Sequence, residues 1–284
     1  MYRIGIDLGG TNIAAGLVNE KFEIIAKEST PTLVGRPNLE IVRDIAALAN
    51  KLCADAGITL REVASLGIAS PGIVDDATGC VVYANNLDFR NFPILPELHK
   101  LLDIAEMHIE NDANAAAWGE AIAGAAKGSK SSVMITLGTG VGGGIVDGGK
   151  VYKGFNNAAG ELGHIPLYDV DEECTCGNIG CSETRCSGKR LEYLAERYFP
   201  DVSIREVFKY HGNSPIILKF VKDLAIPIAT EINILDPDYS IIAGGVTFME
   251  GFPKDVLLKA VHEKVRKPYP EENLEIMFTE HDQQ

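Results

Sequence analysis

The sequence is short of basic residues: 26 Lys and Arg stand against 40 Asp and Glu, which gives a formal charge of −14. This charge repels phosphate backbones and anionic membranes and so disfavours extensive nucleic-acid binding, although a small anionic ligand can still bind a local site. The chain also lacks an apolar run long enough to cross a bilayer. Its first residues, MYRIGIDLGG, lack the basic, apolar and small-residue order of a signal peptide. These absences predict a soluble cytoplasmic protein without nucleic-acid or membrane partners.

Cysteines are few, and their spacing does not resemble a disulfide framework. Four of the six fall between Cys174 and Cys186, whereas a framework of disulfides spreads its cysteines along the chain. In a reducing compartment such a cluster is typical of a metal site. Cys53 and Cys80 lie elsewhere and are expected to be ordinary core residues.

Short apolar strands alternate with helical segments along the 284 residues, without a linker or a low-complexity segment. This pattern predicts an α/β protein of one large domain or two ordinary ones. Strands are expected at 2–7, 13–19, 21–28, 63–72, 107–112 and 238–247, and helices at 39–57 and from Ser214-Pro215 onward. The stretches IDLGGTNIAAGLV and ITLGTGVGGGIV share one strand–turn–strand pattern, which suggests two related α/β halves.

Three glycine turns each follow an apolar strand: Gly9-Gly10-Thr11, Gly138-Thr139-Gly140 with the run 142–144, and Gly244-Gly245. Glycine lets backbone N–H groups approach a ligand closely, and rows of such amides bind anions. None of the turns has the Lys-Ser/Thr pair of a Walker motif. The string Gly138-x-Gly140-x-x-Gly143 matches the dinucleotide fingerprint, but a strand rather than a helix is expected after it. One such turn alone is usually a tight hairpin, whereas three together indicate phosphate binding.

Asn111 and Asp112 stand where a helix is expected to begin, in the stretch ENDANAAAWGE. Both residue types are good N-caps, because their side-chain oxygens accept the free N–H groups of the first turn. The positive end of the helix dipole also favours an ionised carboxylate that can accept a proton, although the same field lowers its basicity. Capping and general-base catalysis are compatible roles for Asp112.

The motifs DLGGTN, LGTGVGGGIV, GELGH, CTCGNIGCSET and AGGV occur in the order found in the ROK group of sugar kinases, which the sequence resembles from Tyr2 to about Thr247. The resemblance implies the actin-like ATPase (ribonuclease H-like) fold, with ATP in a cleft between α/β domains at 1–112 and 113–284. It also implies Mg²⁺-assisted transfer of a phosphoryl group from ATP to a hexose hydroxyl, expected to be the 6-hydroxyl. Asp7 would face the metal-bound phosphates. The residues implied in nucleotide binding are Gly9, Gly10, Thr11, Gly138, Thr139 and Gly140 at the phosphates, and Gly244 and Gly245 near the adenosine.

In the resembling kinases the Asp of this Asn-Asp pair is the general base, a role that falls here on Asp112. Hexose recognition needs several convergent polar groups, because each hydroxyl both donates and accepts hydrogen bonds. Taken alone, Glu161 or Glu183 would more often be a solvated surface carboxylate. The residues expected to contact the sugar are Asn86, Asn111, Asp112, Glu161, His164 and Glu183.

Three thiolates for a zinc ion are implied by the same resemblance: Cys174, Cys176 and Cys181. A structural zinc site needs four nitrogen or sulfur ligands in a tetrahedron. The resembling kinases use His164 as the fourth ligand, and Cys186 is the rival candidate. A His164 ligand would tie the loop of Glu161 to that of Glu183, so that the zinc loop, residues 164–186, shapes the sugar pocket without touching the phosphoryl group. Buried thiols without a metal are the alternative.

The segments AGELGHIPL (159–167) and ETRCSG (183–188) most resemble the allose kinases of the group. In those enzymes Cys-Ser-Gly follows the zinc motif, where glucokinases commonly carry Ala-Ser-Gly. D-Allose is therefore the predicted substrate, with glucose and N-acetylhexosamines as alternatives. Allose differs from glucose only by inversion at carbon 3, so a single hydroxyl contact can decide between the two.

Some members of the group are sugar-responsive repressors with a DNA-binding helix-turn-helix before the sugar domain. Here Asp7 comes almost at once, so no such motif is expected, and a non-catalytic sugar sensor is the alternative of a different class. A homodimer is expected by analogy with the group. The resembling proteins normally continue with a glycine-rich segment and a C-terminal helix, so the end of the sequence at Gln284 departs from their pattern.

Overall fold

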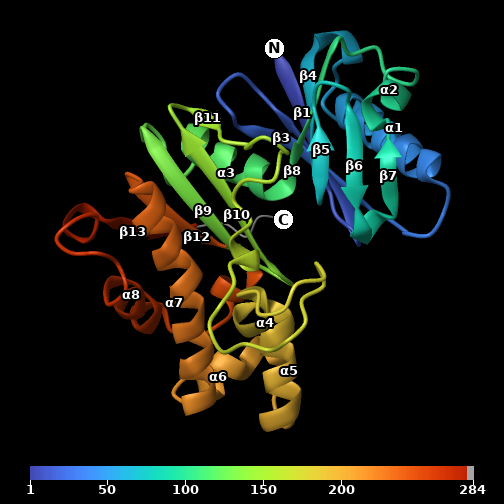
Figure 1. The fold of residues 1–284 in the computed structure, drawn as a ribbon. Coiled ribbons are helices and arrows are strands. Elements are labelled where there is room, and N and C mark those ends of the chain that lie inside the picture. The colour runs from blue at the N-terminus through green and yellow to red at the C-terminus, as the bar shows by residue number, and fades with distance from the viewer. Residues whose placement is uncertain (280–284) are drawn as a thin grey trace. The chain divides into compact units, whose positions relative to one another are not determined.

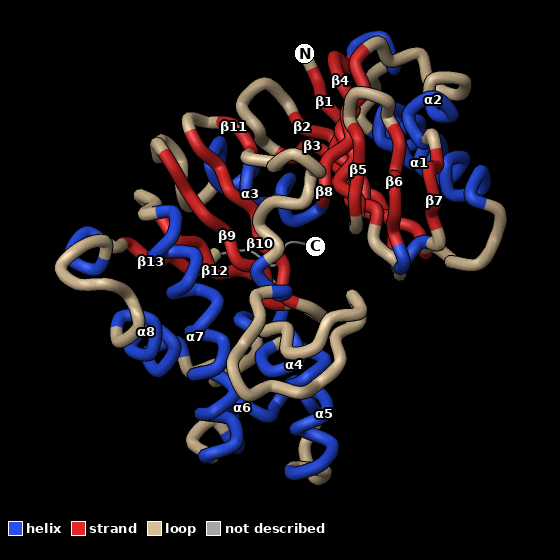
Figure 2. Tube along the Cα trace, viewed as in Figure 1, coloured by secondary structure: helices blue, strands red, loops and turns tan. Residues whose placement is uncertain are grey.

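The computed structural model describes residues 1–279 and divides the chain into two compact units, one of residues 1–115 and one from Ala116 onward. Each unit is an α/β structure built on a sheet (Figures 1 and 2). The division falls within α3 (Asp112–Ala123), and the boundary predicted from the sequence lies at the start of that helix. The departure from the family pattern at Gln284 lies outside the described residues.

The main sheet of the first unit has the strand order β3-β2-β1-β4-β8. Its strands are β1 (Tyr2–Leu8), β2 (Asn12–Val18), β3 (Ile24–Pro31), β4 (Val63–Ser70) and β8 (Glu106–Asn111). β2 is antiparallel to both β1 and β3, whereas β1, β4 and β8 run parallel. Because parallel strands end at one edge, the turn after β1 and the Asn111-Asp112 pair after β8 lie at the same edge of this sheet.

A helix and a smaller sheet complete the first unit. α1 (Asn38–Asp55) buries Ile45 and Leu52 in the core of this unit. The helix ends where the sequence predicts a glycine cap, because Gly57 adopts the left-handed conformation with φ of 68°. The remaining elements are α2 (Ile94–Leu98) and the antiparallel sheet of β5 (Ile73–Asp75), β6 (Cys80–Ala84) and β7 (Phe89–Phe92).

The sheet of the second unit has the order β11-β10-β9-β12-β13. Its strands are β9 (Ser131–Leu137), β10 (Val141–Asp147), β11 (Lys150–Val151), β12 (Tyr239–Ala243) and β13 (Glu275–Phe278). β10 is antiparallel to β9 and β11, whereas β9, β12 and β13 run parallel. The two main sheets therefore share one order of strands and one pattern of directions, as the internal similarity of the sequence suggested.

Helices bury both faces of the second sheet. Met134 packs on one face with Ala117 of α3, and Ile135 packs on the other face with helical residues such as Leu224. The helices of this unit that follow α3 are α4 (Glu183–Cys186), α5 (Gly188–Tyr198), α6 (Val207–His211), α7 (Pro215–Leu235) and α8 (Lys254–His262). No helix within residues 1–279 is both long enough and apolar enough to span a bilayer.

Candidate active site

The first glycine turn leaves two backbone amides open to a ligand. The Gly9 N–H donates to the Asn12 carbonyl at 3.0 Å, whereas the N–H groups of Gly10 and Thr11 have no hydrogen-bond partner among residues 1–279. A Cβ atom on Gly10 would lie 3.3 Å from both Cβ and the carbonyl oxygen of Asn86. The structure therefore brings Asn86, predicted to contact the sugar, against the predicted phosphate turn.

Asn111, rather than Asp112, caps the helix that begins after β8. The Asn114 N–H donates to Asn111 Oδ1 at 3.2 Å, and Asn111 Nδ2 donates to the Gly72 carbonyl at 3.0 Å. The Asn111 amide is thus engaged at both ends, and its side chain also hydrogen-bonds to the Asp112 carboxylate, which lowers the pKa of Asp112. Because the neighbouring amide is the cap, the carboxylate of Asp112 is not needed for capping.

Two carboxyl groups of this unit have raised pKa values. Desolvation is the larger cause for Asp112, and it outweighs the Ala113 N–H, which donates to Asp112 Oδ1 at 2.8 Å and lowers the pKa. The N–H groups at the helix start thus lower the pKa of Asp112, as predicted, but desolvation is the larger effect and the net pKa is raised. Desolvation also raises the pKa of Asp7, and the negative charge of Asp112 raises it further. A bound cation would relieve this repulsion, so the pair fits the predicted Mg²⁺.

The second glycine turn is held from behind by the first residues of α5. The carbonyls of Gly138 and Thr139 accept hydrogen bonds from the N–H groups of Gly188 (2.8 Å) and Lys189 (3.1 Å). The C=O and N–H of one trans peptide unit point in opposite directions, so these bonds turn the Thr139 and Gly140 amides away from α5. A Cβ on Gly188 would lie 2.4 Å from the Gly138 oxygen, so only glycine fits there. Sequence reasoning missed this supporting role.

The third glycine turn leaves the same sheet edge as the second, because β12 runs parallel to β9. Gly244 has a φ of 100°, and a Cβ there would lie 2.4 Å from the Leu137 oxygen. A Cβ on Gly245 would meet no atom within 4 Å. The turn thus packs on the end of β9 through Gly244 and presents Gly245 to open space.

The glycine run 142–144 has a different place from the one predicted. These residues belong to β10 rather than to the phosphate turn. A Cβ on Gly143 would lie 2.6 Å from the Gly160 oxygen, and a Cβ on Gly163 would lie 2.3 Å from the Val141 oxygen. The small residues therefore allow the segment around Glu161 to pack backbone against backbone on β10.

His164 joins the predicted sugar residues of the second unit. Its Nε2 is 3.6 Å from Glu161 Oε2, and its Nδ1 is 3.9 Å from Glu183 Oε1. Glu183 also lies beside the phosphate turn, because a Cβ on Gly140 would be 2.9 Å from its Oε2. Glu161, His164 and Glu183 are therefore together, next to the second turn, while Asn86, Asn111 and Asp112 belong to the first unit.

The four predicted zinc ligands lie within 4.8 Å of one another: His164, Cys174, Cys176 and Cys181. His164 Nδ1 is 3.6 Å from Cys174 Sγ, and the sulfurs of Cys176 and Cys181 are 3.7 Å apart. Tetrahedral zinc, with Zn–S of about 2.3 Å and Zn–N of about 2.0 Å, holds a nitrogen and a sulfur about 3.6 Å apart and two sulfurs about 3.8 Å apart. The donor set therefore fits a structural zinc ion.

Cys186, the rival fourth ligand, lies outside this cluster. Its side chain is 0 % exposed within the apolar core of the second unit, and its Sγ donates to the Ser182 carbonyl at 3.1 Å. The fourth position of the cluster is therefore occupied by His164, whose Nε2 faces Glu161 while its Nδ1 faces the thiols.

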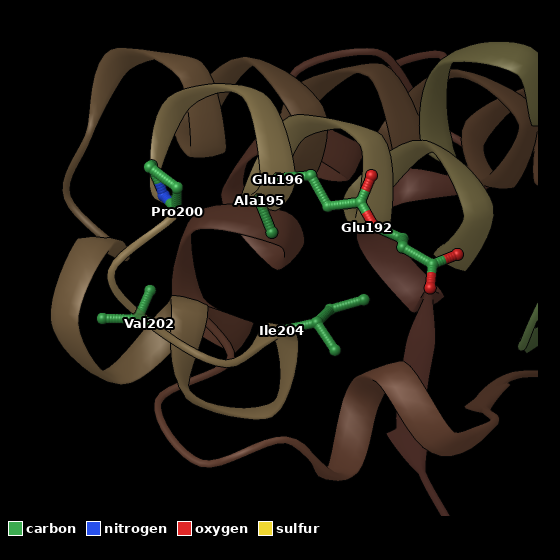
Figure 3. Close-up of a pocket in the computed structure, with 6 residues that line it drawn as sticks. All are labelled: Glu192, Ala195, Glu196, Pro200, Val202 and Ile204. Carbon is green, nitrogen blue, oxygen red and sulfur yellow. The ribbon is translucent and has the colours of Figure 1, made fainter.

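A separate hollow of about 290 Å³ lies on the second unit (Figure 3). Its lining residues are Glu192, Ala195, Glu196, Pro200, Val202 and Ile204. None of them is a predicted site residue, and the two carboxylates oppose an anionic ligand such as a nucleotide. The hollow is therefore not assigned to the candidate site.

Comparison with known proteins agrees with the sequence motifs. The model of the ROK family matches residues 3–284. The glucokinase of Halalkalibacterium halodurans is 31 % identical over 265 residues, which cover 86 % of this chain and 80 % of that protein. The N-acetyl-D-glucosamine kinase of Vibrio cholerae is 33 % identical over 274 residues, which cover 89 % of this chain and 88 % of that protein.

A solved structure agrees with both the fold and the family. The ROK family glucokinase from Streptomyces griseus, crystallised with glucose and AMPPNP, superposes with a TM-score of 0.81. It is 29 % identical, and the match covers 98 % of this chain and 94 % of that one. The chain has the actin-like ATPase fold and belongs to the ROK family.

Proposed function

We propose that the chain is an ATP-dependent hexose kinase that phosphorylates the 6-hydroxyl of its sugar. The observation that carries this proposal is Asp112, a carboxylate at the start of α3 whose pKa is raised by desolvation. It lies at the sheet edge where the turn after β1 presents the unpartnered amides of Gly10 and Thr11. A base and an anion-binding turn in one unit are what phosphoryl transfer to a hydroxyl requires.

Asp112 accepts the proton of the sugar hydroxyl as its oxygen bonds to the γ-phosphorus and the bond to the leaving ADP breaks. The raised pKa suits this role, because a more basic carboxylate holds the proton better. Mg²⁺, when bound near Asp7, would neutralise phosphate charge. The open amides of Gly10 and Thr11 donate to the phosphates of ATP.

The second unit supplies further donors and the sugar contacts. The outward amides of Thr139 and Gly140 bind phosphate oxygens, and Gly245 borders the adenosine. Glu161, His164 and Glu183 accept from and donate to sugar hydroxyls. Zinc, when bound by the cysteines and His164 Nδ1, would supply a rigid tie that fixes the ring and leaves Nε2 for Glu161 or the sugar.

The Cys-Ser-Gly signature on which the prediction of D-allose depends lies away from the predicted sugar contacts. Cys186, which distinguishes the predicted allose signature, lies in the core, and Gly188 packs on the second phosphate turn. The relatives described above are kinases of glucose and of N-acetyl-D-glucosamine. We therefore propose glucose as the first substrate to test, with D-allose and N-acetylglucosamine as the alternatives.

The test is ATP consumption with glucose, D-allose and N-acetylglucosamine, in the wild type and in Asp112→Asn. We expect the substitution to lower kcat by about 10²–10⁴-fold, the usual effect of removing a general base, while ATP and sugar still bind. The matched control is Asp103→Asn, which neutralises an exposed carboxylate of the same unit and should keep the wild-type rate. An unchanged rate in Asp112→Asn contradicts the mechanism. Tight sugar binding without turnover of any sugar indicates the non-catalytic sensor.

A further inference from the structure

Thr32 holds two carbonyl groups of the first phosphate turn. It follows β3, where Pro31 pairs with Asn12 of β2, so the next position along the strand faces the turn. Its N–H donates to the Thr11 carbonyl at 2.8 Å, and its Oγ1 donates to the Gly9 carbonyl at 2.6 Å. The residue is 0 % exposed. One buried side chain and its own backbone thus fix both ends of the three-residue turn.

The bond to Gly9 sets the direction of the amide that follows. In a trans peptide the C=O of Gly9 and the N–H of Gly10 point in opposite directions. When Thr32 Oγ1 draws the Gly9 carbonyl to itself, the Gly10 N–H is turned away from Thr32. This N–H has no partner among the described residues. Without the hydroxyl, that peptide could rotate and present a carbonyl oxygen, which repels phosphate, in place of the N–H.

Thr32 is itself braced by α1. Its carbonyl accepts a hydrogen bond from Arg36 Nε at 3.0 Å. The Arg36 guanidinium forms an ion pair with Asp44 and lies 3.8 Å from Glu40, and both acidic residues belong to α1. The Arg36 side chain is largely buried. Its ion pair with Asp44 is therefore weakened less by solvent than an exposed ion pair would be.

We propose that Thr32 is a positioning residue for phosphoryl transfer, which orients the Gly10 amide toward the phosphates of ATP through its hydrogen bond to Gly9. This inference rests on the proposed function, because it takes those phosphates as the ligand of the turn. It predicts an effect on phosphate binding that a residue with only a structural role would not have.

The test compares the binding of ATP and of adenosine, which lacks phosphates, by calorimetry. Thr32→Val keeps the side-chain shape and the backbone bond to Thr11 but removes the hydroxyl. One hydrogen bond contributes a net free energy of about 0.5–1.5 kcal/mol. We therefore expect the Kd for ATP to rise about two- to tenfold and the Kd for adenosine to stay unchanged. Thr32→Ser restores the hydroxyl and should restore ATP binding.

Thr30→Val is the matched control. Thr30 lies two residues earlier in β3, on the same side of the strand, and pairs with Ile13 of β2 rather than with the turn. This variant should bind ATP as the wild type does. If Thr32→Val does not fold, Thr32→Ala also removes the hydroxyl and can be used in the same comparison.

Two results would overturn the inference: an unchanged Kd for ATP in Thr32→Val, or equal weakening of ATP and adenosine. Since the readout is binding, it is separate from the test of the proposed function. A wild type that binds ATP but phosphorylates no hexose contradicts the kinase proposal, and the comparison at Thr32 still decides this inference.

Discussion

Gly244 and Gly245 are adjacent glycines that the structure predicts to respond in opposite ways to the same substitution. A Cβ on Gly244 would lie 2.4–2.6 Å from the oxygen, nitrogen and carbonyl carbon of Leu137, at a φ of 100°. A Cβ on Gly245 would meet no atom within 4 Å. Each glycine can therefore be changed to alanine as the control for the other.

The cost of Gly244→Ala has two parts. A non-glycine residue held in this backbone region costs about 1–3 kcal/mol. Overlap with a backbone in the middle of a sheet adds the cost of overpacking, about 1–3 kcal/mol, because Leu137 cannot rotate away as a side chain would. The free energy of unfolding should therefore fall by about 2–6 kcal/mol. Gly245→Ala carries neither cost and should leave it within about 1 kcal/mol of the wild type.

Denaturant unfolding of both variants, together with their affinity for ATP, measures the two effects. Gly245→Ala should fold normally but bind ATP more weakly, because its methyl group would occupy the space proposed for the adenosine. A Gly244→Ala protein as stable as the wild type would refute the close approach of this turn to β9. Unchanged ATP affinity in Gly245→Ala would refute the placement of the adenosine beside it.

Two further predictions concern zinc and a buried carboxyl group. His164→Asn should lower the zinc content measured by mass spectrometry, whereas Cys186→Ser should keep one zinc per chain; zinc loss in Cys186→Ser alone would reverse our choice of ligand. Glu231 in α7 is 3 % exposed, its carboxyl oxygens have no hydrogen-bond partner among residues 1–279, and burial raises its pKa well above the ordinary value. The folded protein therefore keeps a proton that the unfolded chain releases above pH of about 4.3, so stability should fall as pH rises toward the folded pKa, by about 1.4 kcal/mol per pH unit. Glu231→Gln should flatten this slope in unfolding experiments from pH 5 to 8, and an identical slope in the variant would contradict the assignment.

Features encoded in short stretches were predictable from the sequence. The glycine turns follow apolar strands, the zinc ligands follow a characteristic spacing, and Gly57 ends α1 as a helix cap does. For the turns and the helix cap the determining residues are neighbours in the chain, so composition and spacing are sufficient; for zinc, the cysteine cluster indicates a metal site, and the resemblance to the family implies His164 as the fourth ligand. The relation between the two halves was suggested by the strand, glycine turn and strand that both contain, whereas the shared order of five strands comes from the structure.

Features that depend on the partner of a residue were not predictable in this way. Asn111 and Asp112 are both good caps, and only the bond from Asn114 to Asn111 Oδ1 decides which one serves. Cys186 lies only five residues after the zinc ligand candidate Cys181, yet its side chain is buried in the core of the second unit. Thr32 lies 23 residues from the glycine whose carbonyl it holds, so nothing local marks its role.

The two turns that we propose bind phosphate share one feature that no motif records: their carbonyl groups accept hydrogen bonds from within their own unit, which leaves amides facing outward. In the first unit the support is Thr32, and in the second it is the start of α5. The duplicated topology explains why both turns exist, but the supports come from different kinds of element.

The support of the second turn, at the start of α5, lies close in sequence to the zinc loop. Cys181 and Ser182 are followed by α4, which carries Glu183, a predicted sugar contact, and then by Gly188, whose N–H donates to the Gly138 carbonyl. One short segment thus leads from the predicted zinc ligands to a predicted sugar contact and on to the turn that we propose binds phosphate. Gly188 lies just beyond the zinc loop, so the loop that is expected to shape the sugar pocket is joined by one short helix to the residue that supports the turn.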